Sequence, residues 1–455
     1  MSDTIAAIST PLGEGGIGIV RVSGDRALDI MKEIFVPCPD TVRPRYAYYG
    51  RIVSGKDRQV IDEAICIYMK APHSYTCEDV VEIQAHGGIV SLRMILRSVL
   101  DAGARMAEPG EFTKLAFLNG RIDLEQAEAV IDIIKAKSSL PLGIAERQLQ
   151  GRLGQEIREM REKIRNTLAQ MAVNIDFPDE DIEQLEYDEF RSQLDPVMKQ
   201  VERLLETGED GRIAKEGIRT AIVGKPNVGK SSLLNALLGE ERAIVTDIPG
   251  TTRDTIEESA SIGGVPLILT DTAGIRQTED VIEKIGIQRS QEKMENADLV
   301  ILVLDGSREL EDEDRKIMEQ IKEQRCLAVV NKEDLGSAVS DLEIQKILPD
   351  ASIVHTSLLT MKGADAITDR IKDMFLKGIR TLGERNIVTS ERHRNALARA
   401  DESLRSAIRL LGIREPLEIS ELEVHTAYDA LGEIIGETAG EEILDTVFSK
   451  FCLGK

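Results

Sequence analysis

The 455-residue sequence predicts an α/β and α chain: an N-terminal α/β domain, a central helical bundle, and a second α/β domain inserted into that bundle. Short apolar runs of β type mark residues 1–118, and helical periodicity precedes and follows residues 213–378. Within 213–378, apolar runs alternate with helical segments, which predicts a mostly parallel, doubly wound sheet. Insertions are tolerated where both ends of a domain emerge together, so the flanking helices indicate one interrupted bundle.

Composition limits the class of protein. The chain is 42% hydrophobic and 30% charged, as globular domains are, and it has no apolar run long enough to span a membrane. Its first ten residues carry no export signal, and its five scattered cysteines show no metal-ligand spacing, so we expect a reducing cytoplasm. The net charge of −23 opposes a large nucleic-acid surface, so we expect a partner to supply much of any phosphate-binding surface for RNA.

The first α/β domain is predicted from three strand-like runs, at residues 17–22, 63–69 and 80–84, and from helical spacing at 91–102. Residues 13–18 formally match the G-x-G-x-x-G dinucleotide pattern. A strand-like run follows them where a helix is needed, and a glutamate inside the match would repel a pyrophosphate, so we reject that site.

Helical spacing begins at Leu124. The helical runs cover residues 124–134, 155–173, 187–207, 389–411 and 420–451. Residues 208–211, Gly-Glu-Asp-Gly, are expected to form a linker, and the acidic cluster at 176–181 is expected to be a solvated turn. The domain boundaries predicted from these patterns are 1–118, 119–212, 213–378 and 379–455.

A phosphate-binding loop is predicted at residues 224–231, between an apolar β-type run and a helical one. Its sequence, Gly-Lys-Pro-Asn-Val-Gly-Lys-Ser, matches G-x-x-x-x-G-K-S in the strand-to-helix context that distinguishes such a loop from a chance match. The glycines allow main-chain N–H groups to turn toward phosphates. Lys230 can reach the β- and γ-phosphates, and the Ser231 hydroxyl can ligate Mg²⁺. Lys225 stands where arginine is common, and we expect no consequence from that difference.

Three further boxes follow in order. Residues 250–254 supply Thr252 as a second hydroxyl for Mg²⁺, and Asp271–Gly274 ends an apolar run where an acidic residue lies near that metal. Asn331–Asp334 follows the next such run, and the Asp334 carboxylate can accept both the ring N–H and the exocyclic amine of guanine. Each box alone could be an ordinary turn, but together they predict a guanine-nucleotide-binding domain.

The expected nucleotide contacts combine these boxes with the segment before Thr251 and with a base-stacking box. They are Asn227, Val228, Gly229, Lys230, Ser231, Ser232, Thr246, Asp247, Ile248, Pro249, Gly250, Thr251, Thr252, Asp271, Thr272, Ala273, Gly274, Asn331, Lys332, Asp334, Ser357, Leu358 and Leu359. The stacking box usually reads Ser-Ala-Lys, and Thr356–Leu359 departs from it, which leaves the guanine contacts there open.

The chain resembles the MnmE (TrmE) family of bacterial tRNA-modification GTPases over essentially its full length. The nucleotide boxes are shared with many GTPases. More specific likenesses lie in Asp3–Ile8, Gly15–Arg21, Pro109–Thr113, Asp123–Ala129 and the ending Phe451–Lys455.

The resemblance implies an N-terminal domain that dimerises and binds a tetrahydrofolate derivative, a helical bundle, and a Ras-like P-loop GTPase domain. It implies a homodimer that works in the cytoplasm, without a membrane, with the flavoprotein MnmG, in a heterotetramer where FAD belongs to the partner. The substrate would be the wobble uridine of certain tRNAs. That base would be modified at C5 with a carboxymethylaminomethyl or aminomethyl group, using 5,10-methylene- or 5-formyl-tetrahydrofolate. The sequence leaves open which tRNAs are used and whether glycine or ammonium donates the nitrogen.

The hydrolytic group is not the usual one. Ras-type proteins place a glutamine after the Asp-box glycine, but this chain has Ile275, whose alkyl group cannot polarise water. The Asn227 side chain can instead ligate K⁺ beside the phosphates, where the ion would neutralise developing charge as an arginine finger does. In the family the K⁺ shell is completed from Thr246, Ile248 and Thr251, and the water-orienting glutamate maps to the catalytic candidate Glu283. Arg253 is more often a brace for the switch loop than an arginine finger.

The folate-binding residues implied by the resemblance are Arg21, Glu82, Arg121 and Lys455. A pterin needs a carboxylate for its amino-pyrimidine edge and a glutamate tail needs cations, so the residue types fit. We expect the last helix to deliver Phe451–Lys455 to that pocket, with Cys452 as a possible modification-site thiol. The alternative is that Phe451 only packs the helix end. A prenylation box at Cys452 is rejected because the terminal residue is lysine.

Two other functions stay open at this stage. A ribosome-assembly GTPase would usually add a basic RNA-binding domain, whereas the C-terminal part here is acidic and helical. A non-hydrolysing G-protein scaffold is suggested by Ile275.

Overall fold

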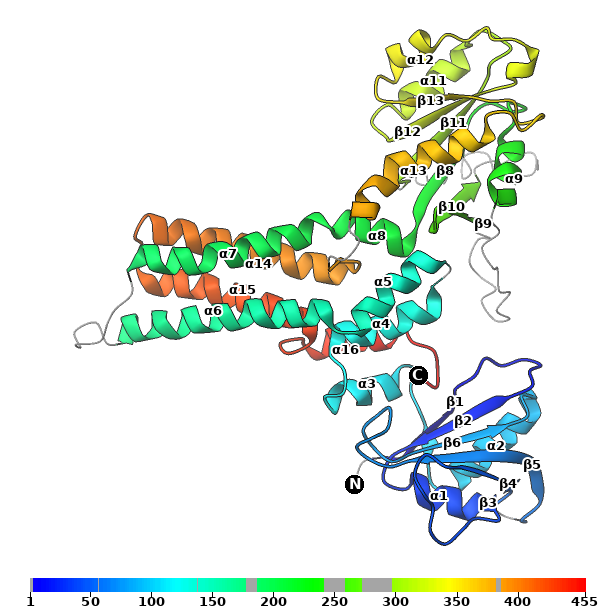
Figure 1. Ribbon diagram of the computed structural model, residues 1–455, viewed down its shortest axis with the longest axis vertical. Coiled ribbons are helices and arrows are strands. Elements are labelled where there is room, and N and C mark those ends of the chain that lie inside the picture. The colour runs from blue at the N-terminus through cyan, green and yellow to red at the C-terminus, as the bar shows by residue number, and fades with distance from the viewer. Residues whose placement is uncertain are drawn as a thin grey trace, which may run out of the picture. The chain divides into compact units, whose positions relative to one another are not determined.

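The computed structural model describes residues 3–55, 57–136, 138–176, 186–240, 258–271, 297–381 and 386–455 (Figure 1). The chain divides into two compact units, which are described separately. The first comprises residues 1–131, 148–166 and 425–455, and the second comprises residues 132–147 and 167–424. Among the described residues, no helix combines the length and the apolar character needed to cross a bilayer.

The first unit is built on a seven-stranded sheet in the order β3-β4-β5-β6-β2-β1-β7. All neighbouring strands are antiparallel except β1 and β7, which are parallel. The strands are β1 (Ile5–Ile8), β2 (Gly18–Ser23), β3 (Phe35–Val36), β4 (Ala47–Val53), β5 (Val60–Met69), β6 (Val80–Ala85) and β7 (Arg105–Met106).

The two faces of this sheet have different environments. Helices α1 (Ala27–Ile34) and α2 (Ile89–Asp101) share one apolar core with Val20 and Val22 of β2 and with Val81 and Ile83 of β6. Side chains alternate along a strand, so Arg21 and Glu82, direct partners in the register of β2 and β6, belong to the opposite face. The sequence pattern located β2, β5, β6 and α2 but missed β1, β3, β4, β7 and α1.

Helices of the first unit connect its sheet to the end of the chain. Helix α3 (Glu111–Leu118), the start of α4 (Leu124–Lys135) and α16 (Glu441–Phe448) meet there. A compact apolar cluster joins them, and it contains Leu124, Ala127, Val447, Phe448 and Phe451. Helices α5 (Ser139–Leu149), α6 (Arg152–Asp176) and α15 (Leu417–Ile435) contribute residues to both units.

The helical prediction for residues 420–451 was wrong in one respect. Two helices, α15 and α16, cover this stretch, and the chain turns between them at Gly436, whose φ is +87°. A Cβ on Gly436 would lie 2.7 Å from the ring of Phe117 and 2.9 Å from the side chain of Leu124. The glycine therefore ends α15 and admits these apolar groups, a requirement set by tertiary packing.

The linker predicted at residues 208–211 was also wrong, because these residues open helix α8 (Gly208–Glu216). Glu209 and Asp210 lie in its first turn, where acidic side chains favour a helix. A Cβ on Gly211 would lie 2.1 Å from the carbonyl oxygen of Val388. The glycine thus provides close packing rather than flexibility.

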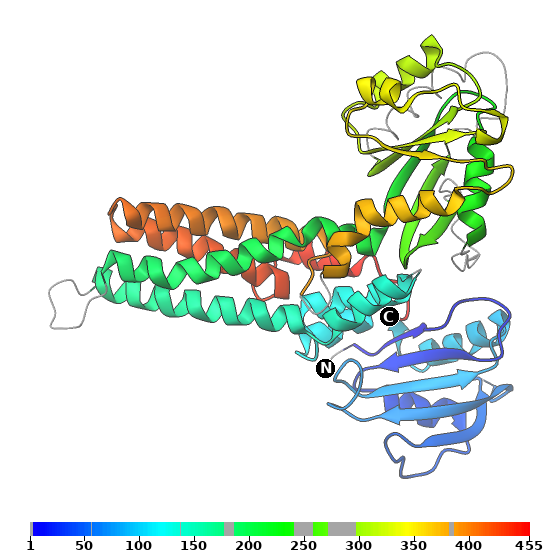
Figure 2. The ribbon, with the colours of Figure 1, turned by 45° about the horizontal axis from the view of Figure 1, so that its top comes forward.

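The second unit contains the helices α7 (Tyr187–Glu206) and α14 (Glu391–Gly412), which lie side by side (Figure 2). Their buried side chains recur at helical spacing. On α7 these are Phe190, Leu194, Val197, Val201 and Leu204, and on α14 they include Ala396, Leu397, Ala400, Leu404 and Leu411.

The second unit also holds a six-stranded sheet in the order β13-β12-β11-β8-β10-β9, and only the β9–β10 pair is antiparallel. This confirms the mostly parallel, doubly wound sheet. The strands are β8 (Ile218–Val223), β9 (Glu258–Ile262), β10 (Val265–Asp271), β11 (Leu299–Asp305), β12 (Cys326–Asn331) and β13 (Ser352–His355).

Helices cover both faces of this sheet. Alternate residues of β11, such as Ile301, share a core with α9 (Lys230–Glu240) and α13 (Ala364–Thr381). The intervening residues, such as Leu302, share a core with α11 (Asp312–Gln320) and α12 (Asp341–Ile347). A strand buried on both faces reads as a continuous apolar run, which is why β11 was evident from the sequence.

The buried face of β11 gives a stability prediction. Leu302 is fully buried, so Leu302→Ala should lower the free energy of unfolding by about 2–5 kcal/mol through lost burial and the cavity left behind. Leu342, in α12, is 69% exposed, and Leu342→Ala should change it by less than about 0.5 kcal/mol. Denaturant unfolding followed by circular dichroism measures both, and equal effects of the two substitutions would contradict the burial assigned to β11.

Candidate functional sites

The predicted phosphate loop lies between the end of β8 and the start of α9. Gly224 and Gly229 have φ values of +144° and +112°, which favour glycine. A Cβ on Gly224 would lie 2.3 Å from the carbonyl oxygen of Val303, and one on Gly229 would lie 2.2 Å from Nδ2 of Asn331. The two glycines therefore allow residues of β11 and β12 to pack closely against the loop. Asn227, at a φ of +63°, adopts the left-handed conformation between them.

Lys230 is held inside the loop that precedes it. Its Nζ donates hydrogen bonds to the carbonyl oxygens of Gly224, at 2.6 Å, and of Lys225, at 2.7 Å. These two carbonyls orient the ammonium group within the loop, where a nucleotide's phosphates would meet it. Ser231 follows at the start of α9, the kind of position whose backbone N–H groups and dipole suit an anion.

Asn331 connects the base box to the phosphate loop. Its Nδ2 donates to the carbonyl oxygen of Val228 at 2.8 Å, and its Oδ1 accepts from the backbone N–H of Leu358 at 3.0 Å. The residue is only 4% exposed. One side chain therefore fixes the phosphate loop, the end of β12 and the loop after β13 relative to one another.

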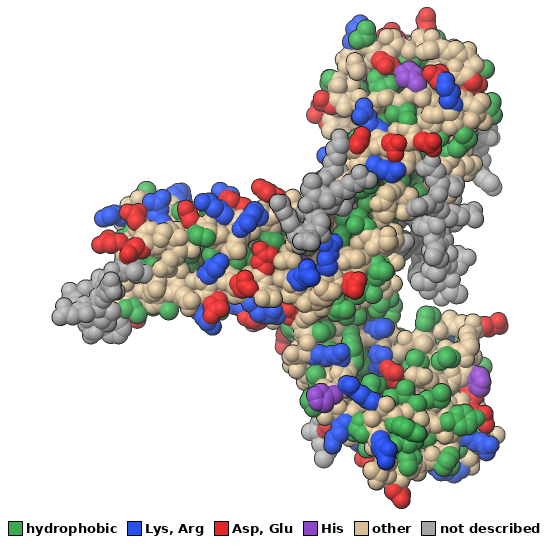
Figure 3. All heavy atoms as spheres, viewed as in Figure 1, with side chains coloured by type: hydrophobic (Ala, Val, Ile, Leu, Met, Phe, Trp, Pro, Cys, Tyr) green, Lys and Arg blue, Asp and Glu red, His purple; other side chains and the backbone are tan. Residues whose placement is uncertain are grey.

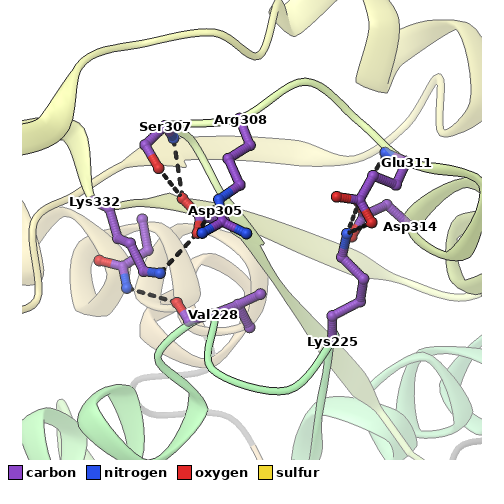
Figure 4. Close-up of polar contacts among 9 residues, drawn as sticks. Lys225, Val228, Asp305, Ser307, Arg308, Glu311, Asp314 and Lys332 are labelled. Carbon is purple, nitrogen blue, oxygen red and sulfur yellow. Dashed lines mark hydrogen bonds and ion pairs between the residues drawn. The ribbon is translucent and has the colours of Figure 1, made fainter.

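Asp334 and Lys332 are also held by side-chain contacts. The hydroxyl of Ser357 donates to Oδ1 of Asp334 at 2.6 Å. The Nζ of Lys332 donates to Oδ2 of Asp305 at 2.7 Å (Figure 4). Although burial opposes it, the hydrogen bonds from Lys332 and Ser307 hold the pKa of Asp305 below its ordinary value, so this carboxylate is a charged anchor for Lys332.

Three of the predicted elements therefore meet at one edge of the sheet, beyond the carboxyl ends of β8, β12 and β13, where ligands bind in open α/β sheets. Asp271 closes β10. Ser232 lies in the first turn of α9, and Leu359, after Leu358, is exposed. The remaining predicted contacts lie outside the described residues: Thr246, Asp247, Ile248, Pro249, Gly250, Thr251, Thr252, Thr272, Ala273 and Gly274, together with Arg253, Ile275 and Glu283.

Sequence reasoning missed three acidic residues, Asp305, Glu311 and Asp314, and with them the contacts of Lys225. Lys225 forms ion pairs with Glu311 and Asp314. The available signal was the Glu-x-x-Asp spacing of residues 311–314, which forms a capping box at the start of α11. Asp305 could not be recognised, because an aspartate ending a strand has no distinctive pattern.

In the first unit, the end of the chain lies against the sheet. The Nη1 of Arg21 donates to the carbonyl oxygen of Gly454 at 3.2 Å, while Nε and Nη2 of Arg21 donate to Oε1 of Glu82 at 3.0 and 2.9 Å. Gly454 has a φ of +86°, and a Cβ there would lie 2.5 Å from the carbonyl oxygen of Ile8. The final residues thus lie beside Arg21 and Glu82, as the sequence predicted.

Helices α3 and α4 hold α16, and with it the tail, in place. Phe451 is buried with Phe448 in the cluster of α16 and α4. Gly110, in the specific segment Pro109–Thr113, has a φ of +72°, and a Cβ there would lie 2.5 Å from the carbonyl oxygen of Phe448. The Nζ of Lys114 pairs with Asp445 at 3.0 Å. The segment at 109–113 therefore admits the last helix, which then carries the tail to the sheet.

Lys455 and Cys452 differ in their surroundings. Burial, followed by repulsion from Arg21, lowers the pKa of the Lys455 ammonium, although Glu82 and Cys452 oppose this. Cys452 is exposed, as an accessible thiol must be. The final residues thus include a partly buried cation near Glu82 and a free thiol close to it in sequence.

A cavity of about 590 Å³ lies beside these groups in the first unit. Ile67, the register partner of Glu82, lines it with Tyr75 and Arg121. The guanidinium of Arg121 donates to the carbonyl oxygen of Ser74 at 2.7 Å. Its centre lies 5.0 Å from the ring centroid of Tyr75, and that of Arg21 lies 5.7 Å from the same ring. Tyr75, which sequence reasoning missed, thus brings the two predicted arginines to one aromatic side chain.

The sheet, the phosphate loop and the base box define a P-loop protein of the guanine-nucleotide-binding class. Two family models match the chain: "GTP-binding protein TrmE N-terminus" over residues 4–121 and "MnmE helical domain" over residues 124–452. The chain belongs to the MnmE family of tRNA modification GTPases, enzymes that bind GTP and Mg²⁺.

Curated relatives agree over the full length. Proteins named tRNA modification GTPase MnmE from Clostridioides difficile (strain 630) and Alkaliphilus metalliredigens (strain QYMF) are each 47% identical over 459 residues, covering 100% of both chains. The protein of that name from Lactobacillus gasseri is 46% identical over 454 residues, covering 100% of this chain and 98% of that protein. Among solved structures, the G domain of the T. maritima FeoB iron transporter aligns with a TM-score of 0.26 and 28% identity, over 34% of this chain and 96% of that one.

The position of Asp334 gives a specificity prediction. Asp334→Asn should weaken GTP binding by roughly tenfold to a hundredfold, because the amide donates where the carboxylate accepts, and it should shift preference toward xanthine nucleotides. Titration with fluorescent guanine and xanthine nucleotides measures both effects. Asp350→Asn, at an exposed position before β13, is the matched control and should bind GTP as the unaltered chain does. Unchanged GTP affinity in Asp334→Asn would remove the assignment.

Proposed function

We propose that the chain is a K⁺-dependent GTPase that works with the flavoprotein MnmG to modify the wobble uridine of certain tRNAs at C5, using a one-carbon unit from a tetrahydrofolate derivative. The observation that carries this proposal is the docked tail, with the Gly454 carbonyl bonded to Arg21 and Arg21 bonded to Glu82. A chain with only switch or scaffold functions has no need to bring its final residues to Arg21, which lies against Tyr75 of the cavity in the N-terminal α/β domain. Membership of the MnmE family also weighs against the ribosome-assembly alternative.

The proposed folate site uses the groups around this cavity. Oε1 of Glu82 accepts both hydrogen bonds from Arg21, so Oε2 is available to the amino-pyrimidine edge of a pterin. Arg121 and Lys455 supply positive charge for the glutamate carboxylates. When bound, the folate supplies the one-carbon unit. The chain's own residues bind and orient it, and the exposed Cys452 is placed by the tail as a thiol that the modification can use.

The proposed hydrolytic site joins the phosphate loop to residues outside the described part of the chain. Ser231 and Thr252 ligate Mg²⁺, and Asn227 ligates K⁺ together with Thr246, Ile248 and Thr251. Glu283 orients the attacking water, because Ile275 has no polar group for that task. The left-handed backbone of Asn227 supports its assignment to K⁺, since it places that residue at a fixed turn of the loop.

The proposed assembly is a homodimer that binds MnmG in the cytoplasm, with FAD on MnmG. The exposed apolar side chains of β4 and β5, Tyr49, Val60 and Ile65, support a protein contact on the first unit, where hydrophobic groups gather on the surface (Figure 3). The net charge of −23 supports a partner's contribution to tRNA binding, because phosphates need cations.

The cation gives the first functional prediction. GTP hydrolysis should be at least about tenfold faster in K⁺ than in Na⁺, because a bound K⁺ offsets charge that develops on the phosphates. Asn227→Ala should lose this difference between the salts. Glu283→Ala should keep nucleotide binding and lose hydrolysis. Phosphate release in the two salts at equal ionic strength is the measurement, and equal rates would exclude the K⁺ mechanism and favour a non-hydrolysing scaffold.

The docked tail gives the second functional prediction. Gly454→Ala should undock the final residues, because its φ of +86° and the 2.5 Å approach to Ile8 exclude a Cβ. GTP hydrolysis should be unchanged, while modified wobble uridine in tRNA should be largely lost, as it should be after deletion of Cys452–Lys455. Gly440→Ala is the matched control, since a Cβ at Gly440 meets nothing within 4 Å.

Nucleoside mass spectrometry of tRNA from cells that carry each variant measures the outcome. Folate binding to the purified variants, followed by calorimetry, separates loss of the folate site from loss of the thiol. Cys452→Ser removes only the thiol, so it should still bind folate. Normal modification by the four-residue deletion would show that the tail only packs the end of α16.

A further inference from the structure

The second residue of the phosphate loop, Lys225, is tied to a different element. Its Nζ lies 2.7 Å from Oδ2 of Asp314 and 3.0 Å from Oε2 of Glu311, at the start of α11 (Figure 4). The Lys225 side chain is 16% exposed and that of Asp314 is 5% exposed. The pair with Asp314 is therefore mostly shielded from water, whereas the Glu311 side chain is 61% exposed, so loss of the Asp314 pair is the costly one.

Asp314 depends on Lys225 for its charge balance. Its Oδ2 accepts the backbone N–H of Glu311 at 3.0 Å, which forms half of the capping box of α11. Its Oδ1 is buried and accepts no hydrogen bond among the described residues. A buried carboxylate needs a nearby cation, and Lys225 supplies it. The hydrogen bond to Asp314 in turn raises the pKa of Lys225, so the lysine is fully charged.

The main chain of Lys225 has a second task. Its carbonyl oxygen accepts the hydrogen bond from Nζ of Lys230 at 2.7 Å. Lys225 is therefore held through its side chain while it holds Lys230 through its carbonyl. Movement of Lys225 away from α11 would displace a carbonyl that orients the ammonium group of Lys230.

The segment that holds Lys225 is anchored at its other end as well. It begins at Asp305, which pairs with Lys332 of the base box at 2.7 Å, and it ends at Asp314, which pairs with Lys225. Ser307 donates to Oδ1 of Asp305 through both its hydroxyl and its backbone N–H, which fixes the turn after β11. Residues 305–314 thus span from the base box to the phosphate loop, with an ion pair at each end (Figure 4).

We propose that Lys225 is a positioning residue for GTP binding and hydrolysis: its ion pair with Asp314 fixes the carbonyl that orients Lys230, and residues 305–314 brace the phosphate loop against the base box. Lys225 itself does not touch the nucleotide. Asp314 and Glu311 belong to none of the nucleotide boxes, yet through Lys225 they help to position the phosphate-binding Lys230.

The test must separate positioning from stability, because Lys225→Met leaves the buried Asp314 carboxylate without a cation and should destabilise the domain. The double variant Lys225→Met/Asp314→Asn removes that unpaired charge, and the asparagine keeps an acceptor for the Glu311 N–H. Its thermal unfolding midpoint should recover most of the loss. The orientation of Lys230 in the double variant should not recover, because the contact that fixes Lys225 is still missing.

We therefore expect both variants to release a fluorescent GDP roughly tenfold faster than the unaltered chain, and to hydrolyse GTP correspondingly more slowly. Lys225→Arg, which keeps the charge and the reach to Asp314, should restore the release rate to within about twofold. Lys372→Met removes a partly exposed lysine of α13 that pairs with Asp369 at 3.2 Å, far from the phosphate loop in sequence, and it should change neither quantity.

Stopped-flow release of the fluorescent GDP and thermal unfolding of the full chain decide whether Lys225 positions Lys230 or acts only through stability. Fast release that persists in the double variant, together with recovery of its midpoint, supports positioning by Lys225. Recovery of the release rate together with the midpoint would overturn the proposal, since Lys225 would then act only through stability. Unchanged release in Lys225→Met would overturn it as well.

Discussion

The arrangement of the nucleotide domain depends on the side chain of Asn331. This amide donates to the backbone of Val228 and accepts from the backbone of Leu358, so three loops from distant parts of the sequence share one buried group. A buried amide with both functions paired has few alternative partners, which makes the arrangement specific. Gly229 provides the room for it, because any side chain there would occupy the position of Nδ2.

The ion pairs of Lys332 and Lys225 extend this arrangement. Asn331 links the base box to the phosphate loop directly, whereas residues 305–314 link them around the outside, through Asp305 and Asp314. Asn331 acts on the backbone of Val228 and Asp314 acts on the side chain of Lys225, and both residues belong to the loop that holds Lys230. The geometry that binds the β- and γ-phosphates is thus prepared by residues that never contact them, a preorganisation that lowers the cost of binding.

In the first unit, the alternation of side chains along β2 and β6 positions the charged groups of the proposed folate site. Arg21 and Glu82 are register partners on the face of the sheet that α1 and α2 do not cover, and the backbone of the tail completes the group through Gly454. Two glycines with positive φ, Gly110 and Gly454, allow the last helix and the tail to approach. Both glycines belong to segments that resemble the MnmE family, Pro109–Thr113 and Phe451–Lys455, and both have a packing role close to the proposed folate site.

Much of the fold was predictable because burial on both faces gives strands such as β11 continuous apolar sequences, and because the phosphate loop has a fixed spacing. The nucleotide boxes that the structure describes were located for the same reason. The sequence could not distinguish Gly211 as a packing residue from a linker glycine, since that distinction depends on Val388, which is distant in the chain. The pairing of Lys225 with Asp314 was hidden likewise, because charged residues at a helix start are common and only tertiary contact shows their partner.

Modification of wobble uridine in tRNA is the activity that we propose for this chain. Mass spectrometry of nucleosides from the tRNA of cells that lack it, with and without a restored copy, is the decisive measurement. Uridines with an aminomethyl-type group at C5 should disappear in the absence of the chain and return with the restored copy. An unchanged set of modified uridines in cells that lack the chain would contradict this proposal.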